Sequence, residues 1–216
     1  METPIRDTWQ VRHVPKALWA RLREDPARAP EHIALAAAEL HGPAAAAWVA
    51  RAGPEYGERH RELAAVAVRQ HVRYARLSGG ATGLGGFTTI AADVAALAWI
   101  QSRMVFFVAA AFGWDPLDPM RPAEMLVLQG VYNDPYEARA GLDGTGATMA
   151  QAYIGSLRDR DRRLMQRLLL MVGTSGAKRL GGKAIPGFAI AFNAIANGGD
   201  TKDLGRRTMA FFGGPA

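Results

Sequence analysis

The chain has 216 residues, which is enough to bury a substantial apolar core without the help of disulfide bonds or a structural metal ion. It contains no cysteine, and this excludes disulfide scaffolds, thiolate zinc sites and cysteine nucleophiles. The net charge of +6 fits a nucleic-acid partner, an anionic lipid surface, or simply the arginine-rich composition expected of a high-GC bacterial genome. The charged, proline-containing start lacks the apolar core of a signal peptide, so we expect a cytoplasmic protein.

The first quarter of the chain carries two stretches with the pattern of amphipathic helices, at residues 9–23 and 31–52. The Gly42-Pro43 pair is expected to interrupt the second stretch, because proline removes a helical hydrogen bond. We predict that residues 1–53 form an N-terminal helical extension, either wrapped around the body or lying on a membrane surface. Residues 54–216 are predicted to form the main helical domain.

A long helix is predicted from Pro54, which suits a first helical turn, to about Leu77. Apolar residues such as Leu63, Val66 and Ala67 recur along it at steps of three and four, which is the helical period. Five arginines, at positions 59, 61, 69, 73 and 76, fall mostly on other sides of this helix.

Residues 88–112 are apolar on nearly every side, so this predicted helix is buried either in protein or in lipid. A membrane-spanning helix needs about 20 apolar residues, whereas Asp93 and Arg103 divide this run into shorter pieces. Each of the two charges would cost about 3 kcal/mol at the centre of a membrane. We therefore predict a central helix buried in a bundle, with a membrane span as the alternative.

The rest of the chain is predicted to be helical as well. An apolar helix is expected to end near Asn133, and residues 135–146 to form a Gly/Asp-rich connection. Further helices are predicted at 147–172 and 201–212, with an apolar run at 184–196. Because no stretch alternates as a strand does, the predicted fold is all-α: a compact multi-helix bundle around the central apolar helix, with the 184–212 segment packed beside it.

Two glycine-rich stretches depart from the phosphate-binding loops that they superficially suggest. Residues 82–86 lack the last glycine of a dinucleotide loop and follow a predicted helix, and residues 176–183 lack a glycine and a hydroxyl residue that a Walker loop needs. The histidines have no metal-ligand spacing, and no serine lies in a nucleophile elbow. We predict no catalytic residue, no metal site and no cofactor.

Polar residues in and before the central helix are the candidate ligand contacts: Thr82, Asp93, Gln101 and Arg103. One interpretation is structural, with Asp93 as the buried partner of an arginine on a neighbouring helix. The other makes these residues the polar end of an otherwise apolar pocket. Near the C-terminus, four side chains are predicted to face a membrane: Arg206, Arg207, Phe211 and Phe212.

Several strings resemble the EcsC family. They are RYARLSGGATGLGGF at 73–87, then Ala92-Asp93, Gln101, Met104 and Phe112-Gly113, and finally KAIPG at 183–187, LGRR at 204–207 and Phe211-Phe212. The similarity covers about residues 54–213, with one departure at Ala91-Ala92-Asp93, where a proline often precedes the aspartate in the family. The resemblance implies a helical bacterial domain with a loose link to membrane processes, because the family is named after a protein encoded beside the subunits of an ABC transporter. It supplies no catalytic residues.

We expect a non-enzymatic domain that binds a lipid or another apolar or amphipathic molecule, or that associates with an anionic membrane surface. The alternative is a protein-interaction accessory of a membrane transporter or protease complex. A third hypothesis is a hydrolase with a site around His71, Asp93 and Ser78 or Ser102. A nucleic-acid partner is not expected, because the chain lacks a known motif and interleaved stacking aromatics.

Overall fold

The computed structural model describes residues 14–25, 28–78, 87–145 and 201–214. Within these ranges the chain folds into helices and contains no strand, which confirms the predicted all-α class. The predicted helix at 147–172 and the apolar run at 184–196 lie outside the described residues. The helices are α1 (Lys16–Glu24), α2 (Ala29–Tyr56), α3 (His60–Ser78), α4 (Phe87–Ala111), α5 (Arg121–Leu128), α6 (Pro135–Leu142) and α10 (Thr201–Gly213).

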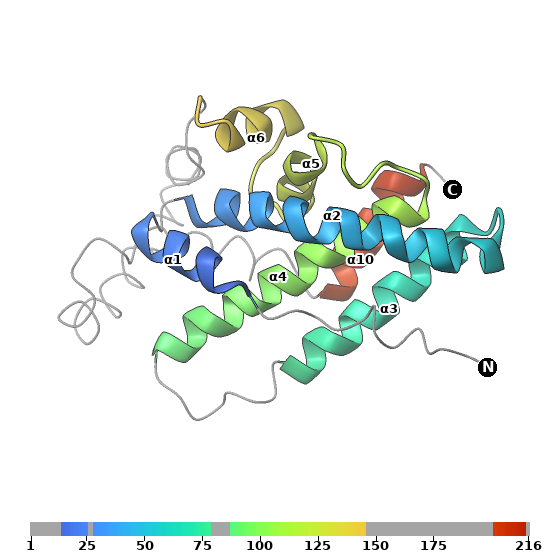
Figure 1. The fold of residues 1–216 in the computed structure, drawn as a ribbon, viewed down its shortest axis with the longest axis horizontal. Coiled ribbons are helices and arrows are strands. Elements are labelled where there is room, and N and C mark those ends of the chain that lie inside the picture. Colours follow the sequence, from blue (N-terminus) through green and yellow to red (C-terminus); the bar gives the residue numbers. More distant parts are fainter. Residues whose placement is uncertain (1–13, 26–27, 79–86, 146–200, 215–216) are drawn as a thin grey trace, which may run out of the picture.

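Helix α4 is the centre of the bundle and packs against α2, α3, α5 and α10 (Figure 1). From Ala98 to Ala111, every side chain of α4 is at most 4% exposed. Burying large side chains such as Trp99, Phe106 and Phe107 stabilises the fold by roughly 1.5–3 kcal/mol each. The prediction of a buried central helix is confirmed, since neighbouring helices cover the apolar surface of α4 from Ala98 to Ala111.

Helix α2 runs without interruption through both Gly42-Pro43 and Pro54. The predicted break at the first site and the predicted helix start at the second are therefore wrong. Both prolines are exposed, and the residues four positions earlier are exposed too, so water can hydrate the carbonyls that lose a helical hydrogen bond. Gly42 has a packing role instead, because a Cβ at this position would lie 2.9 Å from the carbonyl oxygen of Pro116.

The predicted domain boundary between residues 53 and 54 falls inside α2. Ile33, Ala37 and Trp48 of this helix belong to the same apolar core as α4. Among the described helices, α2 is the one that is long and apolar enough to cross a membrane by length and composition, and 44% of its most apolar stretch is buried in the bundle. The part of the chain before residue 54 thus contributes directly to the core.

Helix α3 follows a tight turn at Gly57, whose φ of 55° is easily reached by glycine. Its inner side, with Leu63, Ala64 and Ala67, joins the core. Helix α10, predicted at 201–212 and found at Thr201–Gly213, packs against α3 and α4. Gly205 permits this close approach, because a Cβ there would lie 2.6 Å from Cγ1 of Val68.

The segment after α4 contains one more helix than predicted. Helix α5 ends at Leu128, short of Asn133, because Gly130 leaves the helical region with a φ of 75°. Helix α6 occupies the stretch predicted to be a connection, and that prediction is wrong. The side chain of Asp134 accepts hydrogen bonds from the backbone N–H groups of Tyr136 and Glu137, and Pro135 follows it, so an Asp-Pro helix start outweighs the local glycines.

Candidate functional site

The predicted contacts Gln101 and Arg103 are both buried, but they point to different neighbours. Positions two apart on a helix are separated by about 200° around its axis. Nε2 of Gln101 donates to Oγ1 of Thr201 on α10 at 3.4 Å. The guanidinium of Arg103 lies over the ring of Phe107, with Cζ 4.2 Å from the ring centroid. The structure therefore does not bring these two side chains together.

The other two predicted ligand contacts are not placed at side-chain level. Thr82 lies outside the described residues. Asp93 occupies the first third of α4, and its side chain is likewise outside the described part. Of the four predicted contacts, two are thus located, and both lie in the interior of the bundle.

A buried basic cluster lies where α2, α3 and α4 meet, and it consists of His41, His71 and Arg103. The ring of His41 packs on Trp99, with 4.2 Å between the centroids, and the ring of His71 meets the ring of Phe107 edge-on at 5.4 Å. Burial, and then the charge of Arg103, hold the pKa of His41 well below its ordinary value. Burial also lowers the pKa of His71 to about 3. Both histidines are therefore neutral at pH 7.

The hydrolase hypothesis needs a serine within hydrogen-bond reach of His71. Ser102 instead donates to the carbonyl of Ala98 at 2.7 Å and accepts from Gln129 at 3.4 Å. Nδ1 of His71 is 2.8 Å from the carbonyl oxygen of Ala67 in its own helix. Ser102 and His71 thus form no nucleophile–base pair. Among the described residues, no group of three His, Asp or Glu side chains could hold a metal ion.

Helix α10 presents three of the four predicted membrane-facing side chains on its outer side. Arg206 and Arg207 are exposed, and Phe211 is 47% exposed. Phe212 is only 4% exposed, so its predicted outward position is wrong. Its ring packs against Trp114, whose Nε1 donates to the Phe212 carbonyl at 2.9 Å. The helical period turns two consecutive phenylalanines in different directions, about 100° apart.

The outer side of α3 carries a row of arginines, which we call the arginine face: Arg69, Arg73 and Arg76. Their spacing of four and three residues keeps them within about 60° around the helix axis. All three are exposed, and none makes an ion pair or hydrogen bond with the residues that the structure describes. These arginines are predicted to lie away from the apolar side of the helix but are not among the predicted site residues, although their spacing in the sequence is a readable signal.

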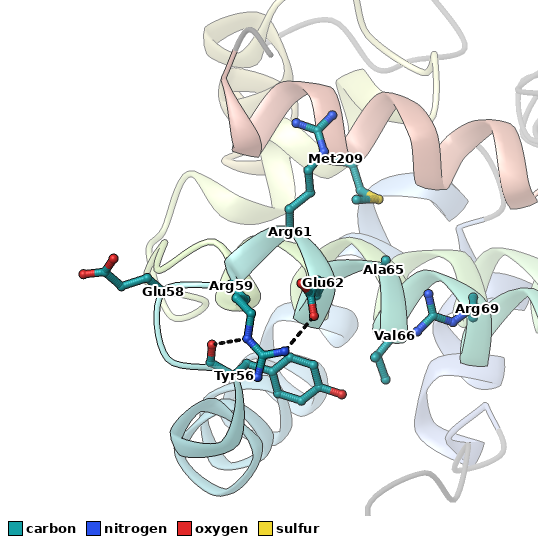
Figure 2. A pocket seen from close by; sticks show the side chains of 9 residues that line it. All are labelled: Tyr56, Glu58, Arg59, Arg61, Glu62, Ala65, Val66, Arg69 and Met209. Carbon is teal, nitrogen blue, oxygen red and sulfur yellow. Dashed lines mark hydrogen bonds and ion pairs between the residues drawn. The ribbon is translucent and has the colours of Figure 1, made fainter.

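A groove of about 700 Å³, open to solvent, lies beside the arginine face (Figure 2). It is formed by the end of α2, the first half of α3 and Met209 of α10. Ala65, Val66 and Met209 give it an apolar surface, while arginines and glutamates provide its charged part. Arg59 is engaged by Glu62 at 2.9 Å and by the carbonyl of Tyr56. The groove thus combines apolar and positively charged walls.

The described helices define an all-α domain, built around one apolar central helix and carrying a basic outer face. The family model described as the EcsC protein family matches residues 58–213. The match covers well over half of the chain, so this protein belongs to the EcsC protein family. No curated protein and no solved structure matches the chain. The matched range includes α3 with its arginine face, the central helix and α10.

Proposed function

We propose that this protein associates peripherally with an anionic lipid surface, such as the inner face of the cytoplasmic membrane, through the arginine face of α3. The observation that carries the proposal is the row formed by Arg69, Arg73 and Arg76, which is exposed and makes no ion pair within the described ranges. Each arginine near an anionic membrane contributes about 1 kcal/mol to binding. Three therefore supply about 3 kcal/mol, or roughly a hundredfold in partitioning.

The surroundings of the arginine face suit the boundary between headgroups and lipid chains. Val66 and Val72 flank the row and are partly exposed, so the arginine stems lie beside apolar surface while the charged ends reach outward. Helix α10 packs beside α3 and adds the half-exposed Phe211, while its exposed Arg206 is paired with Asp203 at 2.6 Å. These features favour a lipid surface over a purely ionic partner.

Vesicle co-sedimentation tests the proposal. The full chain is mixed with vesicles of phosphatidylcholine alone or with added phosphatidylglycerol, at low and at physiological salt. We expect binding only to the anionic vesicles, and weaker binding as salt screens the charges. The variant R69Q/R73Q/R76Q should lose roughly a hundredfold in partitioning.

The matched control is R21Q/R23Q/R51Q, which removes three exposed arginines from α1 and α2 and changes the net charge equally. It should retain binding within a few-fold, because those arginines are not part of the arginine face. If the two triple variants lost vesicle binding equally, binding would depend only on the net charge of the protein, and the proposal would be contradicted. Tighter binding to RNA than to anionic vesicles at the same salt concentration would also contradict it.

A further inference from the structure

We infer that the groove beside Met209 binds the phosphate headgroup of a single amphiphile, with Arg61 and Arg69 contacting the phosphate across Ala65. The inference deepens the proposed lipid association, because it names a specific headgroup where the arginine face alone recognises only charge. The two sites share Arg69, whereas Arg61 and Ala65 belong to the groove and not to the arginine face.

The spacing of these residues on α3 leaves room for one anion between two guanidinium groups. Arg61, Ala65 and Arg69 follow one another at steps of four residues, which is about 40° per step around the axis. The two arginine Cα atoms are therefore about 12 Å apart along the helix. The residue between them is alanine, and its small side chain does not fill the space over which two long side chains can reach.

The charges of the groove leave these two arginines available. Arg59 is bound to Glu62, so those two charges compensate one another. Arg61 and Arg69 form no ion pair or hydrogen bond within the described ranges. Glu58, the remaining carboxylate of the lining, extends away from the other lining side chains (Figure 2). The uncompensated charge beside Ala65 is positive.

A phosphate monoester matches this arrangement better than a carboxylate does. Its three terminal oxygens can accept from two guanidinium groups at once, whereas the two oxygens of a carboxylate are occupied by one bidentate arginine. The apolar surface of Val66 and Met209 adjoins the arginines and suits the first carbons of an attached chain. The volume of about 700 Å³ lies in the range of sites for small molecules, so a headgroup and its glycerol fit, while long chains remain outside.

Isothermal titration of the full chain with dihexanoyl phosphatidate, kept below its micelle concentration, tests the inference without any membrane. We expect saturable binding that is at least tenfold tighter than the binding of inorganic phosphate, because the apolar walls contribute only for the lipid. If inorganic phosphate bound as tightly as the lipid, the inference that the ligand is an amphiphile would be wrong. If the lipid did not bind at all, the inferred headgroup site would be wrong.

Two variants locate the binding. R61Q removes one guanidinium, and A65L fills the space between the arginines at a partly exposed position where the helix tolerates leucine. Each should weaken binding of dihexanoyl phosphatidate at least tenfold, whereas the exposed controls R51Q and A47L on α2 should change it less than twofold. Unchanged binding in A65L would overturn the inference, and circular dichroism verifies that each variant is folded.

The outcomes separate this inference from the proposed function. R61Q and A65L should still bind phosphatidylglycerol vesicles within a few-fold, because the arginine face is intact in both. A protein that binds dihexanoyl phosphatidate but no anionic vesicle would retain the groove site and refute the membrane proposal. A protein that binds anionic vesicles but not the soluble lipid would retain the membrane proposal and refute the groove site.

Discussion

Mild acid should destabilise this fold through its buried histidines. Burial lowers the pKa of His71 to about 3, while an unfolded histidine titrates near 6.5. Below pH 6.5 the unfolded chain therefore binds more protons than the native protein does. The stability that depends on neutral His71 is complete above pH 6.5 and is lost as the pH falls from there toward 3.

The size of the loss follows from the difference between the two pKa values. A pH of 5 is about 1.5 units below the pKa of an unfolded histidine, and each unit corresponds to about 1.4 kcal/mol of differential proton binding. His71 alone should thus lower the free energy of unfolding by about 2 kcal/mol between pH 7 and pH 5. His41, whose pKa is also lowered by burial and by Arg103, acts in the same direction.

Urea unfolding at pH 7 and pH 5, followed by circular dichroism, measures this loss. The variant His71→Gln removes the titrating group, so its loss between the two pH values should be about 2 kcal/mol smaller than that of the native protein. The control Leu63→Val lowers stability on the same helix without removing a titrating group, and it should show the native loss. If His71→Gln showed the full native loss, the buried neutral histidine would not be its cause.

Two substitutions test the packing around α10 and α5 by urea unfolding. Gly205→Ala would place a Cβ 2.6 Å from Val68 Cγ1, and the resulting shift of α10 should cost about 1–3 kcal/mol; a neutral effect would show that the two helices are not in close contact. Arg121→Met removes a side chain that is 1% exposed and paired with Asp118 and Glu124. The loss should be about 3–5 kcal/mol, because a partly buried carboxylate is left without its partner, and a stable variant would argue against that ion pair.

The helical class and the central position of α4 could be predicted because both depend on local pattern. A run that is apolar on all sides has to be covered, and the charge of Arg103 inside it favours protein over lipid as the cover. The helix boundaries at Gly42-Pro43 and Pro54 could not be predicted in the same way. Whether proline ends a helix depends on whether water reaches the freed carbonyl, and that depends on the tertiary packing of α2.

The predicted site shows a similar limit. Sequence identified Gln101 and Arg103 as polar residues that need partners, and the structure gives them Thr201 and the ring of Phe107. Phe107 lies one turn after Arg103 on α4 itself, so the helical period alone brings these two side chains together. Thr201 lies on α10, and periodicity does not say which helix will pack beside Gln101. His41 comes from α2, at a distance in sequence that no local pattern connects to Arg103. The arginine face, in contrast, follows from spacing alone.

The arginine face is also unlike a feature that serves the stability of the helix. Like charges four residues apart on a helix, such as Arg69 and Arg73, repel one another by about 0.2–0.5 kcal/mol. Leu63 and Ala67 on the inner side of α3 belong to the apolar core, whereas the three arginines do not. Replacing the arginines by glutamine should therefore leave the fold equally or slightly more stable. A loss of vesicle binding in the folded triple variant would then measure an interaction with the lipid surface, since the scaffold that presents it is unchanged.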